Sequence, residues 1–118
     1  MQKIFYLSSC STCKRIVAEL EIPSSFSVQD IKACPIKKQE LEALKKLSGS
    51  YEALFSKRAQ LYKQRNLKNK TLSETDYKNL LLEHYTFLQR PILVIGSEIF
   101  IGNAKATIEK AKKTMHES

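Results

Sequence analysis

Two cysteines lie where a short apolar run meets a helical pattern, close to the start of the chain. Ile4 to Leu7 is an apolar run typical of a buried strand. Cys10 and Cys13 follow it, and after them apolar residues recur at helical spacing. A helix N-terminus carries unpaired N–H groups and a partial positive charge, which stabilise a thiolate. The sequence therefore predicts a reactive thiol at a strand-to-helix junction, with a second thiol near enough to form a disulfide.

The segment that follows predicts a second strand and a second helix. Pro23 ends the first helix, and residues 25–28 form a weak strand with Phe26 and Val28 on one face. Leucines at helical spacing between positions 41 and 47 then indicate a helix, and Gly49 is its expected C-terminal stop.

Residues 51–70 predict short helical pieces, and residues 73–76 have the composition of a helix start. The apolar face of the helix that begins there runs from Tyr77 to Leu88. Residues 91–101 predict a tight hairpin, in which Gly96 occupies the turn position that needs a positive φ. A last helix follows, with an inner face at Ile108, Ala111 and Met115.

This order of elements predicts an α/β fold. The first strand, helix and second strand require a parallel crossover, and the hairpin adds two antiparallel strands. We therefore expect a mixed sheet of about four strands flanked by helices. With 118 residues and 42% hydrophobic content, the chain fits a single compact domain over residues 1–118.

The cysteine count favours redox chemistry over a disulfide scaffold or a metal site. Three cysteines are a small and odd number, whereas secreted disulfide scaffolds have many cysteines in even number. A C-x-x-C pair in an intracellular chain is typical of redox or metal chemistry. Tetrahedral zinc would need a second ligand pair, but Cys34, His84 and His116 are single and scattered. We expect no metal, and we interpret Cys34 as a packing residue.

The sequence also predicts the cellular compartment of the protein and the chemical class of its partners. The apolar run before Cys10 is shorter than the roughly 7 to 15 residues of a signal peptide, and no later run could span a membrane, so we expect a cytoplasmic protein. A net charge of +8 favours anionic partners. Residues 57–70 are basic without an acidic residue, yet no nucleic-acid-binding signature accompanies them, so no direct nucleic-acid contact is expected.

Three stretches resemble the arsenate reductase (ArsC) and Spx family, in the family's order and at its spacings. They are CSTCK at residues 10–14, LFSKR at residues 54–58 followed by Tyr62, and LQRPILV at residues 88–94. The resemblance covers nearly the whole chain. It implies a thioredoxin-like fold with a helical insertion, here at about residues 37–88, between the second and third strands.

The resemblance also implies roles for individual residues. Cys10 matches the nucleophilic cysteine, and Arg90 matches an arginine that cradles the oxyanion, which a guanidinium can grip with two parallel hydrogen bonds. Pro91 matches a proline that is often cis and is expected against the cysteines. The other residues expected to bind the oxyanion or to stabilise the thiolate are Thr12, Lys14, Lys57 and Arg58.

Two departures from the reductase pattern point toward Spx. Ser56 stands where reductases have an arginine, with Lys57 and Arg58 just beyond, which is the Spx arrangement. A further reductase arginine has no counterpart near Gly102 and Asn103. The paired cysteines likewise resemble the Spx redox switch, since the reductases commonly need only the first.

We therefore expect a thiol-disulfide oxidoreductase that resembles the glutathione-dependent arsenate reductases and acts on a small oxyanion or a disulfide. Cys10 attacks and Cys13 resolves. Glutathione with glutaredoxin, or thioredoxin, is the expected electron donor, without a bound cofactor, and the protein is expected to be a monomer. The alternative is an Spx-like redox-sensing transcriptional regulator that binds the α subunit of RNA polymerase.

Overall fold

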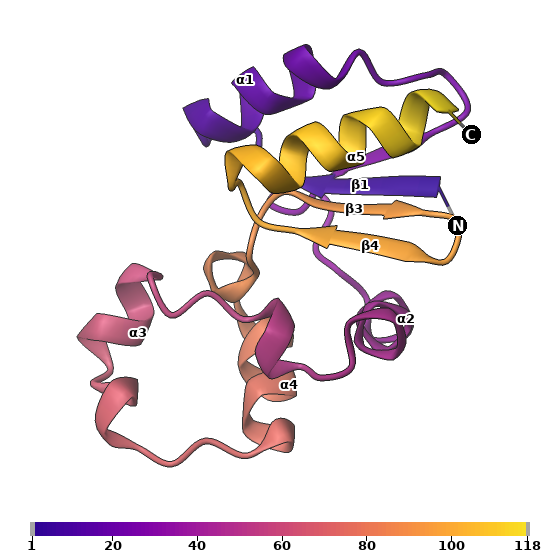
Figure 1. Cartoon of the computed structure of the whole chain (residues 1–118). Coiled ribbons are helices and arrows are strands. Elements are labelled where there is room, and N and C mark those ends of the chain that lie inside the picture. Colours follow the sequence, from indigo (N-terminus) through magenta and orange to yellow (C-terminus); the bar gives the residue numbers. More distant parts are fainter. Residues whose placement is uncertain (1, 118) are drawn as a thin grey trace. The chain divides into compact units, whose positions relative to one another are not determined.

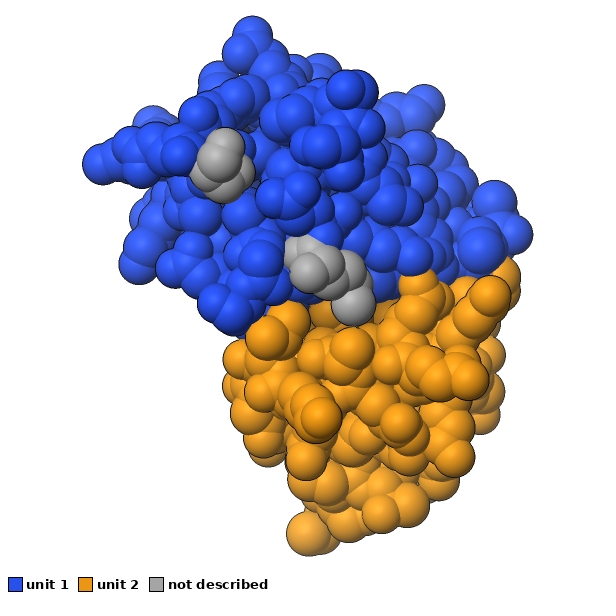
Figure 2. Space-filling view, turned by 90° about the vertical axis from the view of Figure 1, so that its right-hand side faces the viewer, with its two compact units in different colours: residues 1–34, 90–118 blue, residues 35–89 orange. Residues whose placement is uncertain are grey.

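The computed structural model describes residues 2–117, and these form two compact units (Figures 1 and 2). Unit 1 contains the described residues up to Cys34 and those from Arg90 onward, and unit 2 is Pro35–Gln89. The boundaries of unit 2 lie close to those predicted for the helical insertion. The assignment of the whole chain to a single domain stays a prediction.

Unit 1 is a four-stranded mixed sheet with two helices. Its elements are β1 (Gln2–Tyr6), α1 (Ser11–Leu20), β2 (Ser27–Asp30), β3 (Ile92–Ile95), β4 (Glu98–Ile101) and α5 (Lys105–Glu117). The strand order is β2-β1-β3-β4. The pairing of β1 with β2 is parallel, whereas β1 with β3 and β3 with β4 are antiparallel. The predicted α/β fold with a mixed sheet is therefore confirmed.

The two helices of unit 1 lie along one face of its sheet (Figure 1). Ile16 and Leu20 of α1 and Ile108, Ala111 and Met115 of α5 form one buried cluster with apolar side chains of the strands. The predicted inner face of the last helix is thus confirmed. Ile4 and Phe5 are neighbours in β1 and point to opposite faces of the sheet, and both are fully buried. Both faces of β1 are therefore covered, which explains why consecutive residues of the strand are apolar.

The hairpin lies where the sequence predicted it, except that β3 begins at Ile92 rather than at Pro91. Ile95 pairs with Glu98, which leaves the two-residue turn Gly96 and Ser97, and Gly96 has a φ of 63°. A side chain would be strained at that φ, so glycine fits the first turn position.

The second strand is not where the sequence placed it. Residues 25–28 were expected, with Phe26 and Val28 on one face, but β2 is Ser27–Asp30 and Val28 is 45% exposed. Phe26 is buried ahead of the strand. The inward position belongs to Gln29, whose Nε2 donates to the Cys34 carbonyl at 2.8 Å, and this hydrogen bond allows a polar residue to be buried.

Unit 2 consists of helices. Its elements are α2 (Lys38–Ser48), the 3-10 turns η1 (Glu52–Leu54), η2 (Leu67–Asn69) and η3 (Tyr85–Phe87), and the helices α3 (Gln60–Gln64) and α4 (Glu74–Glu83). As predicted, Gly49 ends α2 in the left-handed region, and Ser73 caps α4 by accepting the Asp76 N–H.

The helix α4 is shorter than predicted. It ends at Glu83 rather than continuing to Leu88, because His84 adopts an extended conformation. The Nδ1 atom of His84 accepts the Thr86 N–H at 3.0 Å, so the imidazole starts the turn η3. Of the predicted apolar face, Tyr77, Leu81 and Leu88 are buried, whereas Leu80 and Tyr85 are half-buried. Phe87, which the predicted face did not include, is buried from the turn η3.

None of the helices within residues 2–117 is both long enough and apolar enough to cross a membrane.

We predict that Leu93→Ala destabilises the protein by about 2 to 5 kcal/mol, because Leu93 is fully buried in the central strand β3 and its truncation leaves a cavity. Leu82→Ala is the matched control, since Leu82 is 37% exposed and should change stability by less than about 0.5 kcal/mol. Urea titration followed by circular dichroism measures both. Equal midpoints for the two variants would contradict the assignment of Leu93 to the core.

Candidate functional site

Cys10 occupies the N-cap of α1. Its N–H donates to the Leu7 carbonyl at 3.0 Å and closes a turn, and its own carbonyl accepts the Lys14 N–H at 3.0 Å as the first helical hydrogen bond. Its backbone is extended, with φ −93° and ψ 115°. This is the position from which a side chain meets the unpaired N–H groups of the first helical turn.

The surroundings of Cys10 favour its thiolate. Partial burial opposes ionisation, but the Cys13 N–H and thiol, the charge of Arg90 and the Thr12 N–H outweigh it, so the pKa of Cys10 is lowered. The Cys10 side chain makes no capping hydrogen bond of ordinary geometry. We therefore attribute the lowered pKa to the electrostatic field of these donors and of Arg90 rather than to one well-formed hydrogen bond.

Cys13 has the opposite character. It is buried at 1% exposure, and this burial is the main reason that its pKa is raised. The neighbouring Cys10 raises it further, while the Leu7 N–H and Arg90 act the other way. Both thiols are free. One end of α1 therefore holds an ionisable, partly exposed thiol beside a protonated, buried one, as an attacking and a resolving cysteine require.

Arg90 and Pro91 lie at the start of β3. Arg90 acts electrostatically on both cysteines, and its Nε atom is buried. The Arg90–Pro91 peptide bond is cis. Because Phe5 pairs with Ile92, Pro91 enters the sheet beside the end of β1 from which the cysteine loop leaves. A contact between Pro91 and the cysteines stays a prediction.

The remaining predicted residues of unit 1 differ in position. Thr12 is half-buried, and its N–H contributes to the lowered pKa of Cys10. Lys14 is exposed on α1. Cys34, the spare cysteine, is exposed rather than partly buried, so its interpretation as a packing residue is wrong. Its carbonyl is the group that matters for the fold, because it satisfies the buried Gln29 amide.

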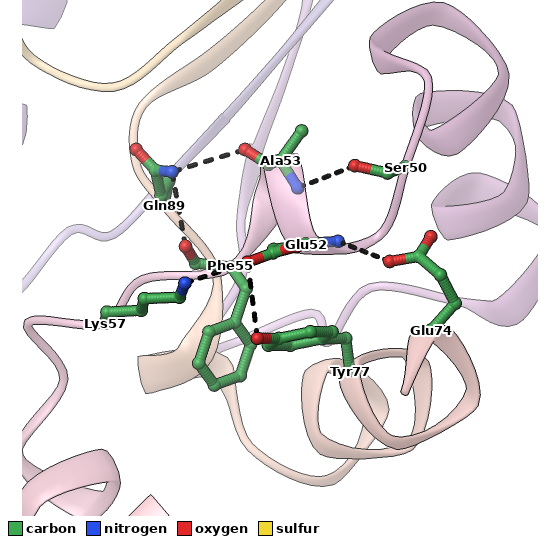
Figure 3. A network of polar contacts seen from close by, with 8 residues as sticks. All are labelled: Ser50, Glu52, Ala53, Phe55, Lys57, Glu74, Tyr77 and Gln89. Carbon is green, nitrogen blue, oxygen red and sulfur yellow. Dashed lines mark hydrogen bonds and ion pairs between the residues drawn. The ribbon is translucent and has the colours of Figure 1, made fainter. Parts of the chain in front are cut away.

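Lys57 and Arg58 belong to unit 2, where Lys57 is part of a polar network (Figure 3). Lys57 Nζ donates to Glu52 at 2.8 Å, and the Tyr77 hydroxyl donates to the same carboxylate oxygen at 3.4 Å. The hydrogen bond to Glu52 is the main reason that the pKa of Lys57 is raised. The positive charge of Lys57 is thus compensated locally by Glu52. The next residue, Arg58, is exposed.

Gln89 holds the segment that carries these cations. Its Nε2 donates to the carbonyls of Ala53 and Phe55, both at 3.2 Å, and its N–H donates to Leu54 at 2.8 Å (Figure 3). The Ser56 N–H completes the ladder by donating to Phe87. Gln89 was not among the predicted site residues, because a ladder between distant segments leaves no local sequence signal.

Ser8 and Asp30 were also missed. The backbone N–H and the hydroxyl of Ser8, two residues ahead of Cys10, both donate to the Asp30 carboxylate. The available signal was the placement of Ser8 after β1 and of Asp30 at the end of β2, because the carboxyl ends of two parallel strands meet at one end of the sheet. Using it required ending the second strand at Asp30.

Within residues 2–117, no group of three or more His, Cys, Asp or Glu side chains is arranged to hold a metal ion.

Comparison with known proteins identifies the family. The family model described as "ArsC family" matches residues 5–111. The chain belongs to the ArsC family. It is 28% identical to an arsenate reductase of Haemophilus influenzae over 111 residues, which cover 89% of this chain and 93% of that protein.

The chain is also similar to proteins that carry other names. The chain is 24% identical to the global transcriptional regulator Spx of Streptococcus pneumoniae, with 86% of this chain and 78% of that protein covered. Among solved structures, an ArsC family related protein from Bacteroides fragilis superposes with a TM-score of 0.74 at 25% identity, covering 92% of this chain and 95% of that one. The thioredoxin-like ArsC fold is therefore confirmed.

We predict that iodoacetamide alkylates Cys10 before Cys13, because the Cys10 thiol has the lower pKa and the greater exposure. Arg90→Gln removes a charge that favours the thiolate, so the pKa of Cys10 rises and its alkylation below neutral pH slows by about threefold to tenfold. Arg90→Lys keeps the charge and serves as the control. Identical pH profiles for wild type and Arg90→Gln would contradict this role of Arg90.

Proposed function

We propose that this protein is a thiol-disulfide oxidoreductase of the arsenate reductase type, with Cys10 as nucleophile and Cys13 as resolving thiol. The observation that carries the proposal is the contrast between the two thiols at the N-terminus of α1, one with a lowered and one with a raised pKa. Membership of the ArsC family and the similarity to an arsenate reductase support the same chemistry.

The first step is attack by the Cys10 thiolate on the arsenic atom of arsenate. A sulfur–arsenic bond forms, and an oxygen of arsenate leaves as water after protonation. Arg90 acts on the Cys10 sulfur electrostatically and carries a guanidinium that suits an oxyanion, because its N–H groups form a fork. We assign it to the stabilisation of both the thiolate and the arsenic oxygens.

The second step transfers two electrons to arsenic. A second thiol, from Cys13 or glutathione, attacks the Cys10 sulfur, a sulfur–sulfur bond forms, and the sulfur–arsenic bond breaks with release of arsenite. The buried Cys13 keeps its proton until Cys10 has reacted, which prevents the two thiols from competing for the substrate. The Thr12 N–H contributes to the stabilisation of the Cys10 sulfur, and Lys14 adds cationic charge on the first turn of α1.

Renewed turnover needs an external reductant, which we propose to be thioredoxin for a Cys10–Cys13 disulfide and glutathione with glutaredoxin for a mixed disulfide. The protein then works as a monomer in the reducing cytosol without a bound cofactor. In unit 2, Arg58 is the better candidate for binding an anion, because the charge of Lys57 is compensated by Glu52.

A second candidate is a redox-sensing regulator of the Spx type that binds the RNA polymerase α subunit. It is favoured by Ser56, which stands where reductases have an arginine, and by the paired cysteines. The similarity to the regulator from Streptococcus pneumoniae supports it. In this function the Cys10–Cys13 disulfide forms by oxidation and is itself the signal.

Arsenate-dependent turnover by the reduced protein tests the two candidates. One arm contains glutathione with glutaredoxin, another contains thioredoxin, and Cys10→Ser is the blank. We expect turnover that the blank abolishes, since no other thiol in residues 2–117 shares the N-cap position. No turnover, with a Cys10–Cys13 disulfide still forming under mild oxidant, would favour the regulator.

The two other cysteines give a matched pair of variants. Cys13→Ser should accumulate a mixed disulfide between Cys10 and glutathione, because the resolving thiol is missing. Cys34→Ser should resolve the mixed disulfide at Cys10 like the wild type, because Cys34 lies outside α1 and the loop before it. Mass spectrometry of the intact protein after reaction with oxidised glutathione measures both. Retention of glutathione by Cys34→Ser alone would reverse the assignment of the resolving thiol.

A further inference from the structure

The carboxylate of Asp30 grips the residue that begins the cysteine loop. The Ser8 N–H donates to Oδ1 at 3.2 Å, and the Ser8 hydroxyl donates to Oδ2 at 2.5 Å. The Lys32 N–H adds a third hydrogen bond, to Oδ1 at 3.2 Å. Both oxygens of one side chain thus hold both donors of one residue, which fixes the position and the orientation of Ser8.

The sheet places Asp30 at this point. In the parallel pair of β1 and β2, Asp30 lies opposite Tyr6, and the Ile31 N–H donates to the Tyr6 carbonyl at 2.9 Å. The last residue of β2 therefore lies beside the residue at which β1 passes into the loop. The Asp30 side chain needs to reach only two residues along that loop.

Ser8 in turn governs where Cys10 lies. It is the second residue of the turn that the Cys10 N–H closes on the Leu7 carbonyl, and α1 begins directly after Cys10. The lowered pKa of Cys10 depends on the placement of its sulfur near the N–H groups of Thr12 and Cys13. A loop with a free Ser8 would let the N-cap residue move relative to those groups.

We propose that Asp30 and Ser8 are positioning residues that hold the cysteine loop, and so hold the Cys10 sulfur in the field of the α1 N-terminus and Arg90. The proposal rests on the proposed function in one respect, namely that Cys10 is the reactive thiolate. Neither residue touches substrate in this role. Their effect reaches the chemistry through the position of Cys10.

The charge of Asp30 alone would have the opposite effect on Cys10. A carboxylate near a thiol disfavours the thiolate and raises the pKa of the thiol, so its removal would lower that pKa. We call the hydrogen bonds between Asp30 and Ser8 the clamp. Loss of the clamp raises the pKa of Cys10, because a sulfur displaced from the helix N-terminus loses the stabilisation of its thiolate. The direction in which the Cys10 titration moves therefore distinguishes a clamp from a simple charge.

The experiment measures the rate of iodoacetamide alkylation at Cys10 against pH, with fragment-ion mass spectrometry to separate Cys10 from Cys13. Cys34→Ser is the background, and Asp30→Ala and Ser8→Ala are the variants. Both should move the Cys10 profile to higher pH and slow alkylation at slightly acidic pH by about threefold to tenfold. The profile of Asp30→Asn should fall between those of the two alanine variants and that of the background, because the introduced amide oxygen can still accept the Ser8 N–H.

Glu98→Ala is the matched control for charge. Glu98 pairs with Ile95, which pairs with Gln2 at the start of β1. Glu98 therefore lies at the far end of the sheet from Tyr6 and Asp30. Its profile should coincide with that of the background. Circular dichroism confirms folding, and Ser8→Ala, which removes one hydroxyl and no charge, decides the question if Asp30→Ala fails to fold.

The outcomes separate the clamp from the proposed function. Profiles of Ser8→Ala and Asp30→Ala that are unchanged, or that move to lower pH, overturn the clamp while leaving Cys10 as a low-pKa nucleophile. A background protein whose Cys10 titrates like an ordinary thiol overturns the proposed function instead, and with it the basis of the clamp. Movement to higher pH in both variants, with Glu98→Ala unchanged, supports the clamp.

Discussion

The parallel pairing of β1 with β2 is the constraint on which the rest of unit 1 depends. A parallel pair needs a crossover, and α1 supplies it, so the chain must leave β1 and begin a helix at the same edge of the sheet. The loop between them is only the four residues Leu7 to Cys10. That short connection brings a helix N-terminus, with its unpaired N–H groups, directly to the first residue that can carry a thiolate.

The same edge of the sheet receives β3 from the other side. Because β3 runs antiparallel to β1, its first residues lie beside the last residues of β1, and Arg90 is delivered to the cysteines although 80 positions separate it from Cys10 in the sequence numbering. The field at the sulfur thus combines a local source, the start of α1, with a distant one, the Arg90 charge. The charge of Arg90 acts on both cysteines, but only Cys13 is buried. This difference in burial gives the two thiols pKa shifts of opposite direction.

Elements with a local signal were predictable from the sequence, and elements decided by a distant partner were not. The hairpin was located by Gly96, the end of α2 by Gly49 and the start of α4 by Ser73. By contrast, β2 was displaced by two residues, since Gln29 is buried only through its hydrogen bond to Cys34. Cys10 and Cys13 were evident from their spacing, but the Asp30 contact with Ser8 depends on a strand register that no local pattern specifies.

The residues of the proposed redox centre and those proposed to select its substrate or partner belong to different units. Cys10, Cys13 and Arg90, to which we assign the proposed thiol exchange, belong to unit 1. Ser56 and the two cations that follow it, which carry the resemblance to the Spx pattern, belong to unit 2. There Glu52 compensates Lys57, and Gln89 fixes the backbone around Ser56. Under the proposed function, we therefore expect substitutions in that segment to change the substrate or partner while the thiol chemistry at the start of α1 stays the same.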